Sequence, residues 1–267
     1  TDGKGRPVAG LVRDDFVLSE DGRPESIRLF QANPTQPLSI VLAIDTSVSV
    51  RRDLPVARQA AYDFAHSLLR PGDRGDRMEL IGFAGDVTEV VPFTGSLHRI
   101  DRGLRALVGD GPTALYAAIA RAAKDLDPLP GRKVIVVISD GSNSMAGTDY
   151  EQARTAALRA QASLESIILV PIDASAGRDL GGEHALIQLS QDTGGQFFYA
   201  DAAGQLQDAM AHLSLALRSE YLLGYYPAST RAGSAQVGSA EMGSAGVGKD
   251  SGMNGFGTYR CGWLSQP

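Results

Sequence analysis

The period of hydrophobic and polar residues changes near residue 38. Before it, residues 15–20 and 24–30 predict two short strands, with Asp21-Gly22 between them. An Asp-Gly pair tolerates the positive φ of a hairpin turn. After residue 38, apolar runs of strand length alternate with segments whose apolar residues recur every three or four positions. We therefore expect a β-rich lead-in over residues 1–37, containing a β-hairpin, and an α/β domain over residues 38–227.

Strands and helices alternate through the predicted α/β domain. The apolar runs of residues 38–44 and 133–139 are typical of strands that are buried on both faces of a sheet. We expect strands at residues 38–44, 78–84, 87–93, 133–139, 167–172, 196–200 and 221–226. We expect helices at residues 53–70, 96–108, 114–127, 149–163, 183–191 and 203–219. This order predicts an α/β fold with a doubly wound, Rossmann-like and mostly parallel sheet that carries helices on both faces.

Residues 228–267 have a different character. The tripeptide Gly-Ser-Ala recurs there, starting at Gly233, Gly238 and Gly243. Small and polar residues of this kind cannot form a hydrophobic core, so we expect a flexible Gly/Ser/Ala-rich tail over residues 228–267.

Composition and charge narrow the classes of function. Hydrophobic residues make up 43% of the chain, which is enough for a sizeable core. The formal net charge of −6 and the absence of a Lys/Arg run argue against a nucleic-acid partner. No apolar run approaches the roughly 18 residues that span a bilayer, and no signal peptide is visible. The chain starts at Thr1 in the middle of a pattern, so we interpret it as a fragment or a processed form.

Two aspartates are expected at the same edge of the sheet. Asp45 follows the strand of residues 38–44, and Asp140 follows the strand of residues 133–139. In the common strand order of doubly wound sheets, the first and fourth strands are neighbours, and ligands bind beyond their carboxyl ends. Counted along the chain, these two strands are the first and the fourth. We therefore expect the two carboxylates to meet although they are far apart in the sequence.

Three hydroxyl residues accompany the two aspartates. Ser47 and Ser49 directly follow Asp45, and Thr113 precedes the helix predicted from residue 114. Carboxylates and hydroxyls are hard oxygen ligands, which suit Mg²⁺, Mn²⁺ or Ca²⁺ and not zinc. With few direct carboxylates, such an ion would keep a position open for an anionic oxygen of a partner. Each motif also has a simpler interpretation, because Asp and Ser are common in loops and helix caps and Thr113 could cap its helix.

The five residues together resemble a known site. Asp45-x-Ser47-x-Ser49, Thr113 and Asp140-Gly141 resemble the metal-ion-dependent adhesion site of von Willebrand factor A domains and integrin inserted domains. The resemblance covers about residues 38–219, including the order of strands and helices. It implies that the five side chains contact the metal directly or through water: Asp45, Ser47, Ser49, Thr113 and Asp140.

Two further segments resemble a bacterial branch of this family. The lead-in from Gly10 to Gly22 and the segment from Tyr221 to Pro227 resemble that branch, whose members are typically exported. The resemblance therefore implies an extracytoplasmic or secreted location. The sequence departs from the branch after Pro227.

The resemblance implies a binding module and not an enzyme. Such domains bind protein ligands, often through an acidic side chain, so the metal is expected to coordinate an Asp or Glu of an unidentified partner. The chain has no Gly-x-Ser-x-Gly elbow and no Walker-type phosphate loop, and its four histidines lie on four different segments. Two alternatives stay open. One is a metal-dependent phosphoester hydrolase, which the carboxylate pair motivates, and the other is a scaffold whose metal only joins three loops.

Overall fold

The computed structural model divides the chain into two units. The first unit comprises Thr1–Pro34 and Leu215–Pro267, and the second comprises Thr35–Ser214. The sequence predicts divisions after residues 37 and 227, whereas the two units divide after Pro34 and after Ser214. Both ends of the chain belong to the first unit because their strands pair with each other. The structure describes residues 8, 10–20, 23–32, 36–69, 75–170, 179–201, 203–219, 221–226, 235–239 and 260–263.

The first unit contains a 3-10 turn and two small sheets. Its elements are η1 (Arg13–Asp15), β1 (Phe16–Glu20), β2 (Arg23–Glu25), β3 (Leu29–Ala32), β10 (Tyr221–Tyr225), β11 (Ala235–Ser239) and β12 (Arg260–Trp263). One sheet has the order β11-β1-β2, with both pairs antiparallel. The other has the order β12-β10-β3, in which β10 is parallel to β12 and antiparallel to β3.

The lead-in matches its prediction in part. The hairpin is confirmed, because β1 and β2 pair antiparallel with Glu20 opposite Arg23. The strand predicted over residues 24–30 is instead two strands, β2 and β3, which belong to different sheets. The segment predicted as a flexible tail contains β11 and β12, and its other residues lie outside the described part of the chain.

An aromatic cluster forms the core of the first unit. Phe16 and Tyr221 are buried, with ring centroids 5.2 Å apart, and Tyr221 stacks on Phe30 at 5.9 Å. The Tyr221 hydroxyl donates a hydrogen bond to the Val8 carbonyl at 2.9 Å and accepts one from the Leu11 amide at 3.0 Å. This tyrosine therefore joins the two ends of the chain through both packing and hydrogen bonds.

The second unit contains the α/β domain. Its strands are β4 (Leu38–Asp45), β5 (Arg77–Phe83), β6 (Val87–Thr94), β7 (Arg132–Ser139), β8 (Ala162–Leu169) and β9 (Phe197–Ala200). Its helices are α1 (Leu54–Leu68), α2 (Leu97–Ala106), α3 (Leu115–Leu126), α4 (Tyr150–Ala160), α5 (Leu180–Asp192) and most of α6 (Ala203–Arg218).

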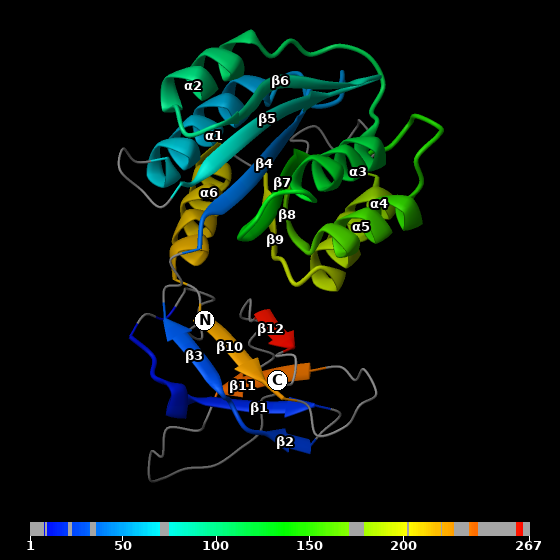
Figure 1. Ribbon diagram of the computed structural model, residues 1–267. Coiled ribbons are helices and arrows are strands. Elements are labelled where there is room, and N and C mark those ends of the chain that lie inside the picture. Colours follow the sequence, from blue (N-terminus) through cyan, green and yellow to red (C-terminus); the bar gives the residue numbers. More distant parts are fainter. Residues whose placement is uncertain are drawn as a thin grey trace, which may run out of the picture. The chain divides into compact units, whose positions relative to one another are not determined.

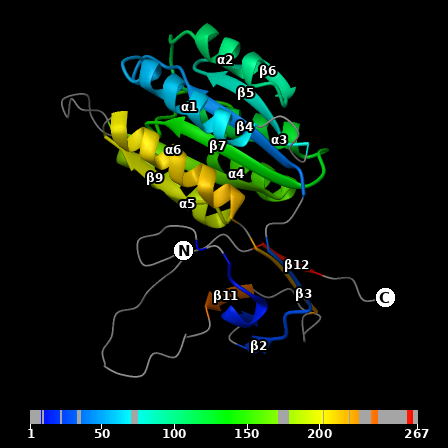
Figure 2. The ribbon, with the colours of Figure 1, turned by 90° about the vertical axis from the view of Figure 1, so that its left-hand side faces the viewer.

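The six strands of the second unit form one sheet in the order β6-β5-β4-β7-β8-β9. All neighbours are parallel except β6, which is antiparallel to β5. The first and fourth strands, β4 and β7, are therefore neighbours, as the sequence predicts. Helices α1, α2 and α6 cover one face of the sheet and α3, α4 and α5 cover the other (Figures 1 and 2). The predicted fold class is confirmed.

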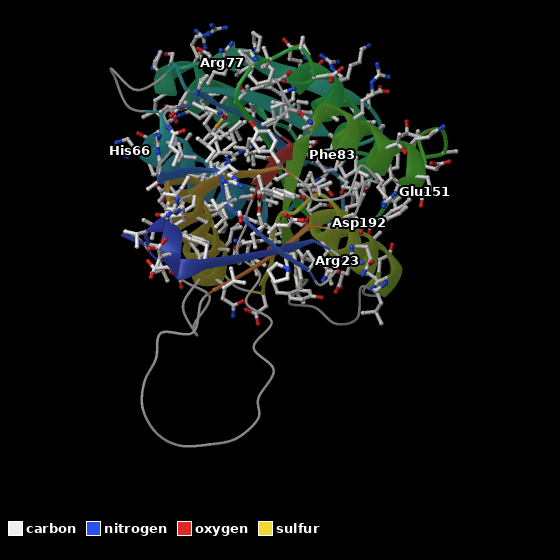
Figure 3. The ribbon with its side chains drawn as sticks, turned by 60° about the horizontal axis from the view of Figure 1, so that its bottom comes forward. Arg23, His66, Arg77, Phe83, Glu151 and Asp192 are labelled. Atoms are coloured by element: carbon white, nitrogen blue, oxygen red, sulfur yellow. The ribbon has the colours of Figure 1, made fainter. Side chains whose placement is uncertain are left out.

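Apolar burial holds this sheet between its helices. All eight residues of β4 are buried, and the predicted apolar stripes of α1 and α3 are buried as well. Phe83, at the end of β5, is fully buried and lies in the interior in Figure 3, whereas the labelled His66 and Glu151 lie at the surface. The strand ends are thus fixed by a packed core, which positions the loops that follow them.

The start of β8 differs from the prediction. The periodicity predicts a helix up to residue 163 and a strand only from residue 167, but α4 ends at Ala160 and β8 begins at Ala162. Gln161 ends the helix in a left-handed conformation, with φ of 55°, where no glycine marks the end. Glu165 interrupts the apolar pattern although it is buried, and it accepts a hydrogen bond from the Gln196 amide at 2.7 Å.

One buried carboxyl group opposes the stability of the core. Glu79 of β5 is 1% exposed, and its Oε2 has no hydrogen-bond partner within the described residues. The nearby Arg121 of α3 binds Asp125 at 2.5 Å and Glu89 at 3.0 Å. Burial, followed by the negative charges of Asp125 and Glu89, raises the pKa of Glu79 to about 8. Glu79 is therefore protonated in the folded protein at neutral pH.

We predict that Glu79→Gln stabilises the protein in alkaline solution. The pKa of Glu79 rises from 4.5 to about 8 on folding, so its contribution to stability is complete below pH 4.5 and is lost as the pH rises to about 8. Glutamine cannot ionise, so the variant should exceed the wild type above pH 8 in the free energy of unfolding by up to about 5 kcal/mol, since a tenfold change in proton affinity corresponds to about 1.4 kcal/mol. Urea unfolding across this range measures the effect, with the exposed Glu151→Gln on α4 as the control, because Glu151 is not among the groups that shift the pKa of Glu79. Parallel pH profiles for wild type and Glu79→Gln would contradict it.

Candidate metal centre

Asp45 is the last residue of β4, and hydrogen-bond donors surround its buried carboxylate. The side chain is 2% exposed. The Ser47 amide donates to Oδ1 at 2.8 Å, and the Ser139 hydroxyl, at the end of the neighbouring strand β7, donates to Oδ2 at 2.6 Å. Sequence analysis missed Ser139, although the hydroxyl residue that ends the apolar run before Asp140 is a signal for it.

The electrostatics at Asp45 favour a cation. Burial raises the pKa of Asp45 to about 6, hydrogen bonds from Ser139 and Ser47 lower it, and the charge of Asp140 raises it. Burial and the charge of Asp140 also raise the pKa of Asp53, an acidic neighbour that sequence analysis missed. Within the described residues, no ion pair to a Lys or Arg neutralises Asp45 or Asp140. A buried carboxylate next to a like charge is costly, and a bound cation would relieve that cost.

The two serines after Asp45 lie side by side. The Ser47 and Ser49 hydroxyl oxygens are 3.0 Å apart, with Ser47 buried and Ser49 exposed. Helix α1 begins at Leu54 with Asp53 as its N-cap, so these serines do not cap the helix. The capping interpretation of the Asp-x-Ser-x-Ser motif is therefore wrong here.

Thr113 is buried at the loop before α3. This helix begins at Leu115 with Ala114 at the N-cap and no side-chain capping bond, so the alternative that Thr113 caps the helix is also wrong. The Thr113 amide donates to the Ser144 hydroxyl at 2.9 Å, and the Ser144 amide donates to the Thr113 carbonyl at 2.9 Å. These two bonds attach the Thr113 loop to the loop that follows Asp140.

The three loops that carry the five predicted residues are hydrogen-bonded to one another. Ser139 joins the ends of β4 and β7 through Asp45, and Ser144 joins the β7 loop to the Thr113 loop. The Val48 amide completes the set by donating to the Gly111 carbonyl at 3.1 Å. Within the described residues, no group of three or more His, Cys, Asp or Glu could hold a metal. A metal at this site would therefore depend on the serine and threonine hydroxyls and on water.

Asp140 lies on a loop that packs against the start of α5. Its side chain is buried, and its Oδ1 accepts a hydrogen bond from the Ser142 amide at 3.0 Å. Gly141 has a φ of +88°, and a Cβ added to Gly182 of α5 would lie 2.0 Å from the Gly141 carbonyl oxygen. Close backbone contact between two glycines thus fixes the position of Asp140.

We predict that Asp45→Asn stabilises the metal-free protein. Because the pKa of Asp45 rises from 3.8 to about 6 on folding, its contribution is complete below pH 3.8 and is lost as the pH rises to about 6. In EDTA above pH 6, the asparagine variant should gain up to about 3 kcal/mol in the free energy of unfolding. Denaturant titration measures the gain, with Asp208→Asn, an exposed position on α6, as the control. An unchanged or lower stability would refute the idea that Asp45 is electrostatically strained.

We predict that Gly182→Ala disturbs the Asp140 loop. A Cβ at residue 182 would collide with the Gly141 carbonyl, so backbone must move and stability should fall by about 1–3 kcal/mol. Gly204→Ala on α6 is the control, because nothing lies within 4 Å of its added Cβ and alanine favours helix. Thermal unfolding compares the two variants, and equal melting temperatures would show that the close contact is unimportant.

Comparison with known proteins concerns the fold of the second unit. Residues 40–142 match the family model of the von Willebrand factor type A domain, and curated proteins give no match. Three solved bacterial structures share the fold. The conserved hypothetical protein BatB from Bacteroides thetaiotaomicron is 22% identical, with 66% of this chain and 97% of that chain covered and a TM-score of 0.52. The vWF domain of the type V pili tip protein Mfa5 from Porphyromonas gingivalis is 13% identical, with 69% and 96% covered and a TM-score of 0.57. A von Willebrand factor type A structure from Catenulispora acidiphila is 13% identical, with 74% and 51% covered and a TM-score of 0.58.

At these identities the structural likeness concerns the fold alone. The matched residues 40–142 include all five predicted metal residues, from Asp45 to Asp140. The second unit therefore has the fold of solved von Willebrand factor type A structures, and its residues 40–142 match the model of that family.

Proposed function

We propose that the second unit is a von Willebrand factor A-type domain that binds a divalent cation and, through it, an acidic group of a protein partner. One observation carries the proposal. The buried Asp45 carboxylate lies beside Asp140 without a positively charged partner in the described part of the chain, on loops that also supply serine and threonine hydroxyls.

The donor set fits a hard cation such as Mg²⁺, Mn²⁺ or Ca²⁺. The proposed ligands, direct or through water, are Asp45, Ser47, Ser49, Thr113 and Asp140. The cation, when bound, supplies a positive charge that an incoming carboxylate oxygen can approach. Ser139 and the Ser47 amide orient the Asp45 carboxylate and favour its ionised form, because both donate hydrogen bonds to it.

Structures with the same fold support a role in attachment outside the cytoplasm. They include the pili tip protein Mfa5 from Porphyromonas gingivalis and the pilus adhesin SpaC from Lactobacillus rhamnosus GG. We therefore propose that this chain acts in binding and not in catalysis, at an extracytoplasmic location. In the described part of the chain, no helix is both long and apolar enough to cross a membrane.

We predict that Mg²⁺ stabilises the wild-type protein and that Asp140→Ala removes the effect. A cation that binds only the folded state raises the free energy of unfolding by about 2.7 kcal/mol at about 100 times its Kd. The effect should weaken below pH 6, because Asp45 must lose its proton to bind the cation. Isothermal titration with MgCl₂ and MnCl₂ measures binding, and thermal unfolding measures stabilisation.

The control is Asp208→Ala, which removes an exposed carboxylate on α6 and should bind Mg²⁺ as the wild type does. Equal Mg²⁺ binding by wild type and Asp140→Ala would refute the proposed site. Capture of partner proteins in Mg²⁺ and in EDTA then tests recruitment. Stabilisation by Mg²⁺ without any Mg²⁺-dependent partner would favour the scaffold alternative.

A further inference from the structure

Each of the three loops at the candidate metal centre exposes an apolar side chain. Val48 follows Ser47 and is 54% exposed, Val108 is 79% exposed, and Met145 follows Ser144 and is 38% exposed. A single exposed apolar residue needs no explanation. These three, however, stand on loops that are hydrogen-bonded to one another, so they accompany the predicted metal residues on one end of the sheet.

Two hollows flank the Thr113 loop on this face. One, of about 420 Å³, lies between the β5–β6 hairpin and the loop after α2 and is lined by Val90, Leu107 and Pro112 among others. The other, of about 260 Å³, lies between the same hairpin and the loop after β7 and is lined by Ala117 and Met145 among others. The smaller volume lies below the roughly 300–1,000 Å³ of pockets that hold small-molecule ligands, and the larger lies in the lower part of that range. Each hollow has room for a single side chain of a partner.

Asp86 belongs to both hollows. It lies in the turn between β5 and β6, where the Ala84 amide donates to the Asp86 carbonyl at 3.0 Å. Its side chain is exposed, and its carboxylate has no hydrogen bond or ion pair within the described residues. Asp110 also lines the larger hollow, but its carboxylate is bound by Arg51 at 3.4 Å, and Arg51 also binds the Gly109 carbonyl at 3.0 Å. Asp86 therefore offers an unneutralised negative charge in a hollow that also contains the apolar side chains of Val90, Leu107 and Pro112.

We propose that the partner is a polypeptide segment that carries a Lys or Arg close to its metal-binding acidic residue, and that Asp86 binds this basic side chain. Lys and Arg place an apolar stem along apolar surface and keep the charge at its edge. The larger hollow provides both parts, with Val90, Leu107 and Pro112 for the stem and Asp86 for the charge. This inference rests on the proposed function, because the acidic residue of the segment is held by the cation.

The charges of the two subsites are complementary to such a segment. The cation attracts the acidic residue, while Asp86 disfavours a second acidic residue nearby and attracts a basic one. The cation thus selects segments that contain an acidic residue. Among these, Asp86 selects the segments that also carry a basic residue. Val48, Val108 and Met145 add apolar contact area around the two charges.

Selection from a random-peptide phage library tests the inference. The immobilised full chain is screened in Mg²⁺ and in EDTA, as wild type, Asp86→Lys, Asp86→Asn and the control Asp208→Lys. Asp208 is exposed on α6 and lines neither hollow, so its variant changes the net charge equally without changing the site. Synthetic versions of the selected peptides are then measured for their Kd.

The expected result is that wild type and Asp208→Lys select, in Mg²⁺ only, peptides with an Asp or Glu and a nearby Lys or Arg. Asp86→Lys should lose the preference for the basic residue and keep that for the acidic residue. Asp86→Asn should weaken binding of the selected peptides about fivefold, as removal of a surface ion pair does. Acidic peptides without basic enrichment, or basic enrichment that persists in Asp86→Lys, would overturn this inference and leave the proposed function intact. If no variant selects Mg²⁺-dependent peptides, the proposed function fails and the inference fails with it.

Discussion

The parallel pairing of β4 with β7 is the constraint on which the site depends. Its register places Ile44 beside Ile138, so Asp45 and Ser139 end neighbouring strands and Asp140 follows directly. Asp45 and Ser139 are 94 positions apart in the sequence, so it is the pairing of the two strands that brings them together. The pairing in turn depends on burial of both strands on both faces, since each contributes mostly apolar side chains to the two helical layers. A polar site at the rim is thus held by an apolar interior.

Much of this arrangement could be predicted because its determinants are local. The apolar runs of β4 and β7 and the stripes of α1 and α3 are read directly from periodicity, and the strand order then follows from the general topology of such folds. The parts that were missed depend on tertiary context. The charged Glu165 interrupts the apolar pattern of its strand, and its hydrogen-bond partner, the Gln196 amide, is 31 positions away in the sequence. The sequence pattern therefore does not show that Glu165 can be buried. Ser139 donates to Asp45, and Asp53 feels the charge of Asp140, only when the ends of β4 and β7 lie side by side.

The first unit shows the same limit more strongly. Its strands are three to five residues long, and several pair with segments from the opposite end of the chain, as β1 does with β11 and β3 with β10. Short strands carry little periodic signal, and no local pattern encodes a partner so distant in the sequence. Tyr221 illustrates this point, since its contacts with Phe16, Phe30 and Val8 depend on the chain returning to its beginning.

Two buried acids in the same sheet show how the proposed cation site differs from a carboxyl group of the core. Glu79 and Asp45 are about equally buried, at 1% and 2% exposed. Glu79 keeps an oxygen without a partner and faces the carboxylates of Asp125 and Glu89, so its surroundings favour the protonated form. Asp45 instead accepts hydrogen bonds at both oxygens, from Ser47 and Ser139, which favour the charged form and partly offset its burial. Within the described residues, no Lys or Arg neutralises Asp45, and its hydrogen-bond donors stabilise the charged form. The proposed cation site requires this combination, and of these two acids only Asp45 has it.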